Sequence, residues 1–338
     1  MKPTDFAYYL TNYLSEYLPG SLGAGRNTII AYRDTFKLFL RFAREQEGIR
    51  EDRISLSHID KEFVLRFLSW IENERGCSVS TRNARLAVIR AFAGYLQGEI
   101  PDQLYRFQDI LSIPMKKHIT ENIEFLSARG VKVLLAEPDI KTKAGRKHLL
   151  LLSFLFATGC RVQEVCDAIV ADVMYNENAI VKLTGKGAKS RFVPLEPSFM
   201  KLLRQYISEF GLADPQHSND FLFLNHMGKQ LTRQGVTYVV KKYASQARLK
   251  YPELIPENLS PHVLRHSKAI DLLRAGVELI YIRDILGHVS VQTTEIYARI
   301  DGEMKRKALE KASGKTINEV MPSWQKDRSL LEWLNSLT

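Results

Sequence analysis

The chain has 338 residues, of which 45% are hydrophobic and 25% charged, so it has enough apolar material for two packed domains. Its 48 Lys and Arg residues outnumber its 38 Asp and Glu residues, and the formal net charge of +10 favours a polyanionic partner. The 3 cysteines are too few for a disulfide framework or a four-thiolate zinc site, and no run of about 18 apolar residues predicts a membrane span. We therefore expect a cytoplasmic protein without a membrane segment.

The first third of the sequence predicts a small helical bundle. Apolar residues recur there at three- and four-residue steps, the spacing of amphipathic helices. The segments with this spacing are 4–18, 28–45, 61–73 and 81–96. We assign residues 1–115 to this bundle. A proline, adjacent lysines and polar residues then interrupt the periodicity, so we expect a linker at 116–124.

Residues 125–312 predict a second domain that is mainly helical. Helical spacing occurs at 128–136, 145–158, 197–210, 232–247, 260–275 and 278–286. Between 179 and 195, β-branched runs flank a glycine-rich turn, which predicts a β-hairpin. The predicted fold class is therefore mostly α, of the α+β kind, with one small β-hairpin.

The tail, residues 313–338, predicts one more helix. Its apolar side chains form a stripe of Leu330, Trp333, Leu334 and Leu337. A terminal helix with such a stripe needs a groove, either in its own chain or in a neighbouring protomer.

The segment SPHVLRHSKAIDLL places two histidines and an arginine at the start of a predicted helix. Arg265 offers planar, permanently charged donors for phosphate oxygens, and His262 can move a proton near neutral pH. His262 and His266 are four residues apart and could share a metal ion, but Arg265 between them would repel a cation. We therefore predict no metal here. The alternative interpretation is a capped helix with solvated polar residues.

A second basic group lies in the turn TGKGAKSR of the predicted hairpin. Lys186 stands between two glycines, with Lys189 and Arg191 just behind it, so ammonium and backbone N–H groups can approach a phosphate. The spacing is not that of a P-loop, and the glycines join two strands rather than lead into a helix. The alternative is a flexible solvated turn.

Two further segments carry polar residues in unusual places. In LLSFLFATGCRVQEVCDA, Arg161 and Glu164 follow a strongly apolar helix and a Thr-Gly break, which favours a functional over a merely solvating cation. In DILGHVSVQTTEIYARI, His288 follows Gly287 and Tyr297 comes nine residues later. A single tyrosine among apolar neighbours is most often a core residue.

Taken together, these blocks resemble the catalytic motifs of the tyrosine recombinase (phage integrase) family. ATGCRVQEV, TGKGAKSRFVPL, HVLRH, LGH and TTEIYARI stand in the family's order and at nearly its intervals. The helical N-terminal region, which includes STRNARLAVIRAFAGYL, is similar to the family's core-binding domain. The resemblance implies a site-specific DNA recombinase that cleaves and rejoins DNA through a covalent 3′-phosphotyrosine.

By this resemblance Tyr297 is the nucleophile that attacks the scissile phosphate. Arg161 and Arg265 correspond to the clamps on the non-bridging oxygens, and His288 to a further donor.

The proton-transfer roles also follow from the resemblance. Lys186 matches the general acid that protonates the departing 5′-oxygen, and His262 matches the residue that assists proton transfer from the tyrosine. Glu164 corresponds to an acidic residue that orients Arg161 or a histidine. Because cations supply the charge of a metal, the resemblance implies no cofactor, neither a divalent ion nor ATP.

The implied partner is double-stranded DNA with short inverted core sites, held between the two domains. Most contacts would be to phosphates. The candidate DNA-binding residues are Arg82, Arg85, Arg90, Lys189 and Arg191. The resemblance also implies a homotetramer in the synapse, with the tail docked in cis or in trans, and admits accessory DNA-bending or directionality proteins.

The biological role is open between several interpretations. Cys160, Lys268 and Asp271 depart from the family's usual pattern and, with the extended tail, favour movement or integration of a mobile element. The first alternative is Xer-like resolution of chromosome or plasmid dimers. A DNA-binding regulator that keeps the fold without turnover, and a topoisomerase-like nicking and closing enzyme, are the others.

Overall fold

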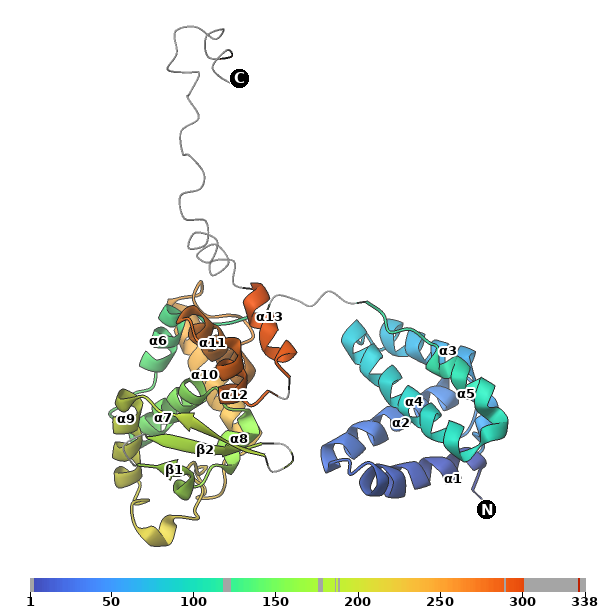
Figure 1. Ribbon diagram of the computed structural model, residues 1–338, viewed down its shortest axis with the longest axis horizontal. Helices are drawn as coiled ribbons and strands as arrows, with labels where there is room; N and C mark the ends of the chain where they lie inside the picture. The colour runs from blue at the N-terminus through green and yellow to red at the C-terminus, as the bar shows by residue number, and fades with distance from the viewer. Residues whose placement is uncertain are drawn as a thin grey trace. The chain divides into compact units, whose positions relative to one another are not determined.

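The computed structural model describes residues 3–117, 123–175, 179–185, 187, 189–288, 290–300 and 334 (Figure 1). The chain divides into two compact units, an N-terminal unit of Met1–Glu121 and a C-terminal unit of Asn122–Thr338. Part of the predicted linker and, apart from Leu334, the whole predicted tail helix lie outside the described residues. Among the described residues, no helix is long and apolar enough to cross a membrane.

The N-terminal unit is a helical bundle, as predicted. Its elements are α1 (Asp5–Asn12), the π-helix η1 (Tyr13–Ser21), α2 (Arg26–Glu45), η2 (Leu56–His58), α3 (Lys61–Asn73), α4 (Val79–Glu99), η3 (Pro101–Gln103) and α5 (Leu104–Leu111). Three helices begin at side-chain caps, because Thr4, Asp60 and Ser78 each accept a hydrogen bond from a backbone N–H three residues later. Helix α5 was not predicted from the sequence.

Aromatic side chains fill the core of this unit. Phe6 packs edge-on against Phe92, with ring centroids 6.0 Å apart, and Phe39 packs edge-on against Phe67 at 5.1 Å. Such pairs add about 0.5–1.5 kcal/mol beyond the apolar area they bury. The bundle is therefore held together by the same aromatic residues whose spacing predicts its helices.

The C-terminal unit is mainly helical with a small antiparallel sheet, which confirms the predicted fold class. Its elements are α6 (Ala128–Ala136), α7 (Lys143–Thr158), α8 (Val162–Asp167), η4 (Val170–Asp172), β1 (Val173–Met174), β2 (Ile180–Thr184), β3 (Ser190–Pro194), α9 (Pro197–Glu209), η6 (Pro215–His217), α10 (Arg233–Lys250), α11 (Pro261–Arg274), α12 (Leu279–Leu286) and α13 (Gln292–Ile300). Strands β2 and β3 form the predicted hairpin, with Leu183 opposite Arg191, and β1 adds a third strand that the sequence did not predict.

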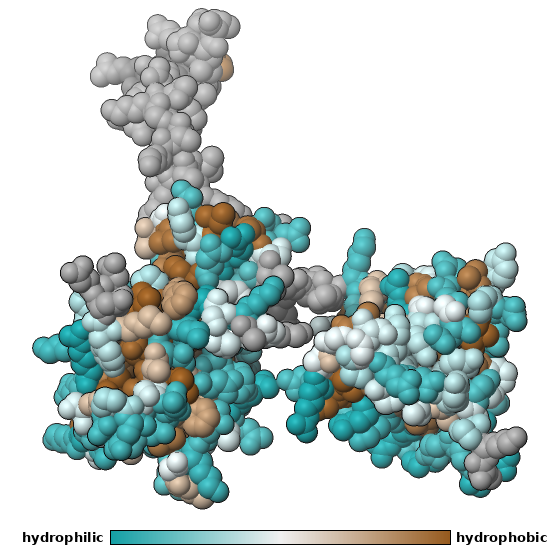
Figure 2. All heavy atoms as spheres, turned by 60° about the horizontal axis from the view of Figure 1, so that its bottom comes forward, coloured by the Kyte–Doolittle hydropathy of each residue, from teal (hydrophilic) through white to brown (hydrophobic). Residues whose placement is uncertain are grey.

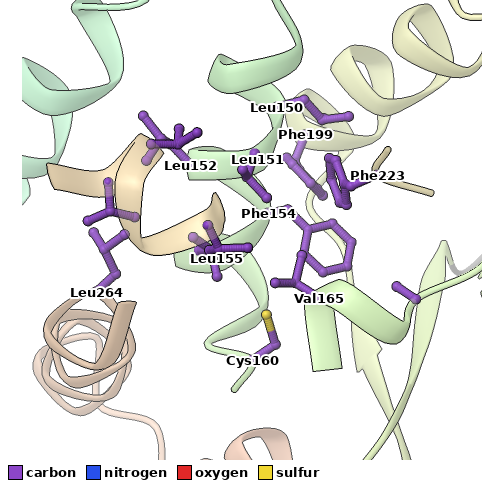
Figure 3. Close-up of a cluster of buried hydrophobic side chains, with 14 of the residues drawn as sticks. Leu150, Leu151, Leu152, Phe154, Leu155, Cys160, Val165, Phe199, Phe223 and Leu264 are labelled. Atoms are coloured by element: carbon purple, nitrogen blue, oxygen red, sulfur yellow. The ribbon is translucent and has the colours of Figure 1, made fainter. Parts of the chain in front are cut away.

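Helix α7 is the centre of this unit's core. Its side chains lie between Phe199 and Phe223 on one side and Leu264 of α11 on the other (Figure 3). Phe154 of α7 packs edge-on against Phe223, with ring centroids 5.5 Å apart. On the face seen in Figure 2, polar residues predominate and apolar ones form scattered patches.

Two glycines end the helices that lead to the polar residues singled out above. Gly159 ends α7 with φ of 56°, and Gly287 ends α12 with φ of 66°, both in the left-handed region that glycine tolerates best. A Cβ on Gly159 would stand 2.6 Å from Cδ2 of Leu286. The ends of α7 and α12 therefore approach each other closely, and α11, α12 and α13 pack side by side next to them (Figure 1).

The position of Phe154 predicts a large loss of stability on truncation. Phe154→Ala removes a fully buried ring and leaves a cavity, so we expect the free energy of unfolding of the C-terminal unit to fall by about 3–5 kcal/mol. Urea denaturation followed by circular dichroism measures this change. Phe192, whose exposed fraction is 55%, provides the matched control, and Phe192→Ala should cost far less. Equal losses in the two variants would contradict this description of the core.

Candidate active site

The C-terminal unit gathers three arginines, a glutamate, two histidines and a tyrosine from five segments. Arg161 and Glu164 come from the start of α8, Arg191 from β3, Arg265 and His266 from α11, His288 from the residue after Gly287, and Tyr297 from α13. Glu164 is hydrogen-bonded to Arg161 and Arg191, and Tyr297 to His266. We call Arg161, Glu164, Arg191 and Arg265 the arginine group, because Arg265 interacts with the other three through its charge. The second group consists of Tyr297, His266 and His288.

Glu164 is the anion of the first group. Its Oε1 accepts hydrogen bonds from Nη1 of Arg161 at 2.9 Å and from Nη1 of Arg191 at 2.8 Å. Its Oε2 accepts from Nη2 of Arg191 at 2.7 Å and from the backbone N–H of Arg161 at 2.8 Å. Burial alone raises the pKa of the Glu164 carboxyl, but the hydrogen bonds and charge of Arg191 and Arg161 outweigh it and lower the pKa. Glu164 is therefore a carboxylate that holds two arginines.

Backbone carbonyl groups at the end of α12 hold all three arginines. The carbonyl oxygens of Ile285, Leu286 and Gly287 accept, in that order, from Nε of Arg191, Nη2 of Arg265 and Nη2 of Arg161, each at 2.7 Å. The last carbonyls of a helix have no partner within it and carry the negative end of its dipole, so they suit cations.

Arg265 is the most deeply buried of the three arginines, with an exposed fraction of 4%. Its Nη1 also donates to the carbonyl oxygen of Gly159 at 2.7 Å. Burial and the charge of Arg161 lower the pKa of Arg265 to about 10, which leaves the guanidinium charged at neutral pH. Arg161 is more open, because 37% of its side chain is exposed.

The second group surrounds the hydroxyl of Tyr297, a residue that is only 3% exposed. This hydroxyl shares a hydrogen bond of 2.8 Å with Nδ1 of His266. The ring of His288 stacks on the tyrosine ring at 6.3 Å, while its Nδ1 is hydrogen-bonded to Oγ1 of Thr294 at 2.9 Å. Burial raises the pKa of Tyr297 and the charge of Arg265 opposes this. Burial and neighbouring positive charge lower the pKa of both histidines to about 4, so both rings are neutral at pH 7.

His262 lies one turn before His266 but in different surroundings. It is exposed and lines a groove of about 870 Å³ together with Arg233, Lys241 and Tyr238 of α10. Partial desolvation of its ring in the groove, followed by the charges of Arg265, Arg233 and Arg161, lowers the pKa of His262. The structure thus brings His266, rather than His262, to the tyrosine hydroxyl.

The resemblance assigns seven residues to the site, and the structure describes all of them except Lys186. It brings five of these six residues together. Arg161, Glu164, Arg265, His288 and Tyr297 belong to the two groups, and His262 lies in the adjoining groove.

Lys186, the predicted general acid, lies outside the described residues. Its neighbour Gly185 lies against the first group, because a Cβ on Gly185 would stand 2.9 Å from Oε1 of Glu164.

The residues predicted to bind DNA differ in their exposure to solvent and in their hydrogen bonds within the chain. Lys189 is exposed and Arg90 is partly exposed. Nη1 of Arg82, a residue 4% exposed, donates to Asn83, and Nη1 of Arg85 donates to Oγ1 of Thr35 at 2.8 Å. Their contacts with DNA stay predictions.

Arg191 has a role that the sequence did not reveal. Only 12% of its side chain is exposed, and Nε, Nη1 and Nη2 all donate within the chain. We therefore assign it to the support of Glu164, and its contact with DNA stays a prediction. The sequence points to His266 only as a possible metal ligand and gives no sign of its contact with Tyr297. Among the described residues, no group of three or more His, Cys, Asp or Glu side chains could hold a metal ion.

Two parts of the chain match models of known protein families. Residues 124–304 match the phage integrase family, and residues 11–99 match the phage integrase N-terminal SAM-like domain. Together these matches cover both units of the chain.

Individual relatives are similar over most of the chain. The integrase/recombinase y4rC of Sinorhizobium fredii is 34% identical over 99% of both chains. The tyrosine recombinase XerD of Listeria monocytogenes is 29% identical over 82% of this chain and 89% of its own. The Tn1549 transposon integrase, solved in complex with transposon right end DNA, shares the fold with a TM-score of 0.70 at 18% identity, over 90% of this chain and 99% of the other.

The central position of Glu164 predicts that loss of its charge destabilises the C-terminal unit. Glu164→Gln leaves two arginines without their buried anion, so we expect the free energy of unfolding to fall by about 3–5 kcal/mol. Urea denaturation measures the change. Glu209→Gln is the matched control, because Glu209 also pairs with an arginine, Arg146, but at the surface. A loss no larger than that of the control would contradict the role given to Glu164.

Proposed function

We propose that this chain, which belongs to the phage integrase family and is a tyrosine-type site-specific recombinase, uses Tyr297 as its nucleophile to move or integrate a mobile genetic element. The surroundings of its hydroxyl carry the choice of Tyr297 as nucleophile. The hydroxyl is hydrogen-bonded to His266, and the positive charge of Arg265 is close enough to oppose the rise in the pKa of the tyrosine that burial causes.

The chemistry follows from the two groups. The phenolic oxygen of Tyr297 attacks the scissile phosphorus, the bond from phosphorus to the 5′-oxygen breaks, and a 3′-phosphotyrosine remains. Arg161 and Arg265 stabilise the charge on the non-bridging oxygens, with His288 as a further donor. Lys186, next in the chain to Gly185, protonates the leaving 5′-oxygen. Attack by a 5′-hydroxyl on the phosphotyrosine reverses the steps and rejoins the DNA.

The charge of the arginine group supports this assignment. Two guanidinium groups, of Arg161 and Arg191, bind the carboxylate of Glu164, and the third, of Arg265, is held by backbone carbonyls nearby, so three positive charges stand against one negative charge. A DNA phosphate supplies the missing negative charge. Since these cations are already in place, the proposed chemistry uses neither a divalent metal ion nor ATP.

The groove beside His262 is the proposed path of the DNA next to the catalytic residues. Arg233 and Lys241 give it positive charge, and Gln163, Gln234 and Thr237 give it hydrogen-bonding groups. We propose short inverted core sites as substrate, with four protomers in the synapse. Accessory DNA-bending or directionality proteins fit the same scheme.

The mobile-element role rests on the similarity to y4rC, an integrase/recombinase that aligns with 99% of this chain, whereas the alignments with XerC and XerD recombinases cover 82–90%. Xer-like resolution of chromosome or plasmid dimers is the second candidate, because XerD aligns over both units.

The proposal predicts that removal of one oxygen atom abolishes covalent attachment. Tyr297→Phe should bind DNA with the wild-type affinity and form no adduct, while Arg265→Ala should slow adduct formation by about 100-fold or more. The substrate is a nicked suicide duplex that carries a site selected by the purified chain from a random-sequence DNA library. The adduct is a protease-sensitive shifted band on a denaturing gel, formed in EDTA.

Tyr281→Phe is the matched control, because Tyr281 is 59% exposed on α12 and should keep full activity. An adduct formed by the Tyr297→Phe protein would exclude Tyr297 as the nucleophile.

A further inference from the structure

Helix α11 carries two histidines that stand on successive turns but meet different surroundings. His262 is exposed and lines the groove that we propose as the path of the DNA. His266 is half-buried, and its Nδ1 lies 2.8 Å from the hydroxyl oxygen of Tyr297. The two histidines therefore cannot serve the tyrosine equally.

We propose that His266, and not His262, accepts the proton of the Tyr297 hydroxyl when the tyrosine attacks DNA. This inference rests on the proposed function, since it takes Tyr297 as the nucleophile. The O–H bond breaks and its proton passes to Nδ1 of His266, while the oxygen's electron pair forms the new bond to phosphorus. The bond to the 5′-oxygen breaks, and Lys186 supplies the proton for that oxygen. On rejoining, the imidazolium of His266 returns its proton to the tyrosine oxygen.

The geometry of the pair meets the requirement for a general base. A base must lie within about 2.6–3.2 Å of the atom it deprotonates, and the hydrogen bond of 2.8 Å does so before DNA binds. With its own proton on Nε2, the ring presents a free lone pair on Nδ1 to the hydroxyl. The two rings pack at a centroid distance of 5.6 Å, so helices α11 and α13 fix their relative position. Tyr297 is 3% exposed, so the tyrosine is largely shielded from bulk water.

The charges around His266 connect proton transfer to DNA binding. The groups that face it are His262 and Arg265 on α11, His288 after α12, and Tyr297 on α13. Burial and the nearby positive charge make its imidazolium unfavourable in the free protein, so the proton stays on the tyrosine. A phosphate held by Arg161 and Arg265 adds a negative charge that stabilises the imidazolium. The nucleophile is thus kept protonated until a phosphate is in place.

The test compares His266→Asn with the matched control His262→Asn in single-turnover cleavage. Two versions of the selected suicide duplex are used, one natural and one with sulfur in place of the bridging 5′-oxygen at the cleavage site. A thiolate leaves without a proton, so the sulfur version removes the need for a general acid. We expect His266→Asn to slow cleavage of both versions by about 100-fold or more. His262→Asn should cost much less, and Lys186→Ala should be slow only on the natural version.

The dependence of the rate on pH separates a proton acceptor from a residue that only positions the tyrosine. The wild-type rate should level off once His266 is neutral in the DNA complex. In His266→Asn, the rate should keep rising towards the pKa of the tyrosine, because hydroxide then removes the proton. A purely positional role would lower the rate by the same factor at every pH. His266→Gln provides a second variant, and DNA affinity and thermal unfolding establish that each variant is folded.

The outcomes are distinct. If the wild-type protein forms an adduct and His266→Asn cleaves at the wild-type rate, or keeps the wild-type pH profile at a lower rate, the role of His266 is refuted and the proposed function stands. If Tyr297→Phe forms an adduct as readily as the wild type, both the proposed function and the role of His266 are refuted.

Discussion

The arginine group depends on the carbonyl groups that helix α12 leaves free at its end. Three successive carbonyl oxygens, of Ile285, Leu286 and Gly287, each accept a hydrogen bond from a different arginine. A helix end is a natural place for cations, because its last carbonyls have no intrahelical partner. The arginines come from α8, β3 and α11, so one helix end fixes the relative positions of three elements.

This arrangement explains why the arginines can stand so close together without neutralising partners for each. Neutral carbonyl dipoles hold the guanidinium groups, and the single carboxylate of Glu164 offsets only part of their charge. The remaining positive charge is available to an anion. Gly287 makes the approach feasible, because a Cβ there would stand 2.9 Å from Nη1 of Arg191. The absence of a side chain at Gly287 therefore allows Arg191 to pack against the end of α12.

The sequence predicted much of this molecule. Periodic apolar residues such as Phe63, Phe67 and Ile71 predict helix α3, and these residues are buried as that spacing requires. The short motifs predicted Arg161, Arg265, His288 and Tyr297, which the structure brings together. The two-residue strand β1 is too short for periodicity to detect, whereas helix α5 does place the buried Phe107 and Ile110 at helical spacing and was overlooked.

The roles of Arg191 and His266 were missed for a different physical reason. Arg191 is held by a backbone carbonyl 94 residues away, and a carbonyl has no signature in the sequence. His266 and Tyr297 are 31 residues apart on different helices, so only the packing of α13 on α11 makes them neighbours. A motif indicates which residue types a site contains, but contacts between elements decide which histidine touches the tyrosine.

The central claim is that the arginine group and Tyr297 form one phosphoryl-transfer site. The most direct measurement is peptide mapping by mass spectrometry of the wild-type protein after it has been trapped on the suicide duplex and digested with protease and nuclease. We predict that the nucleotide remnant is attached through phosphorus to the peptide that contains Tyr297. A remnant on another tyrosine, such as the exposed Tyr281, would contradict the account.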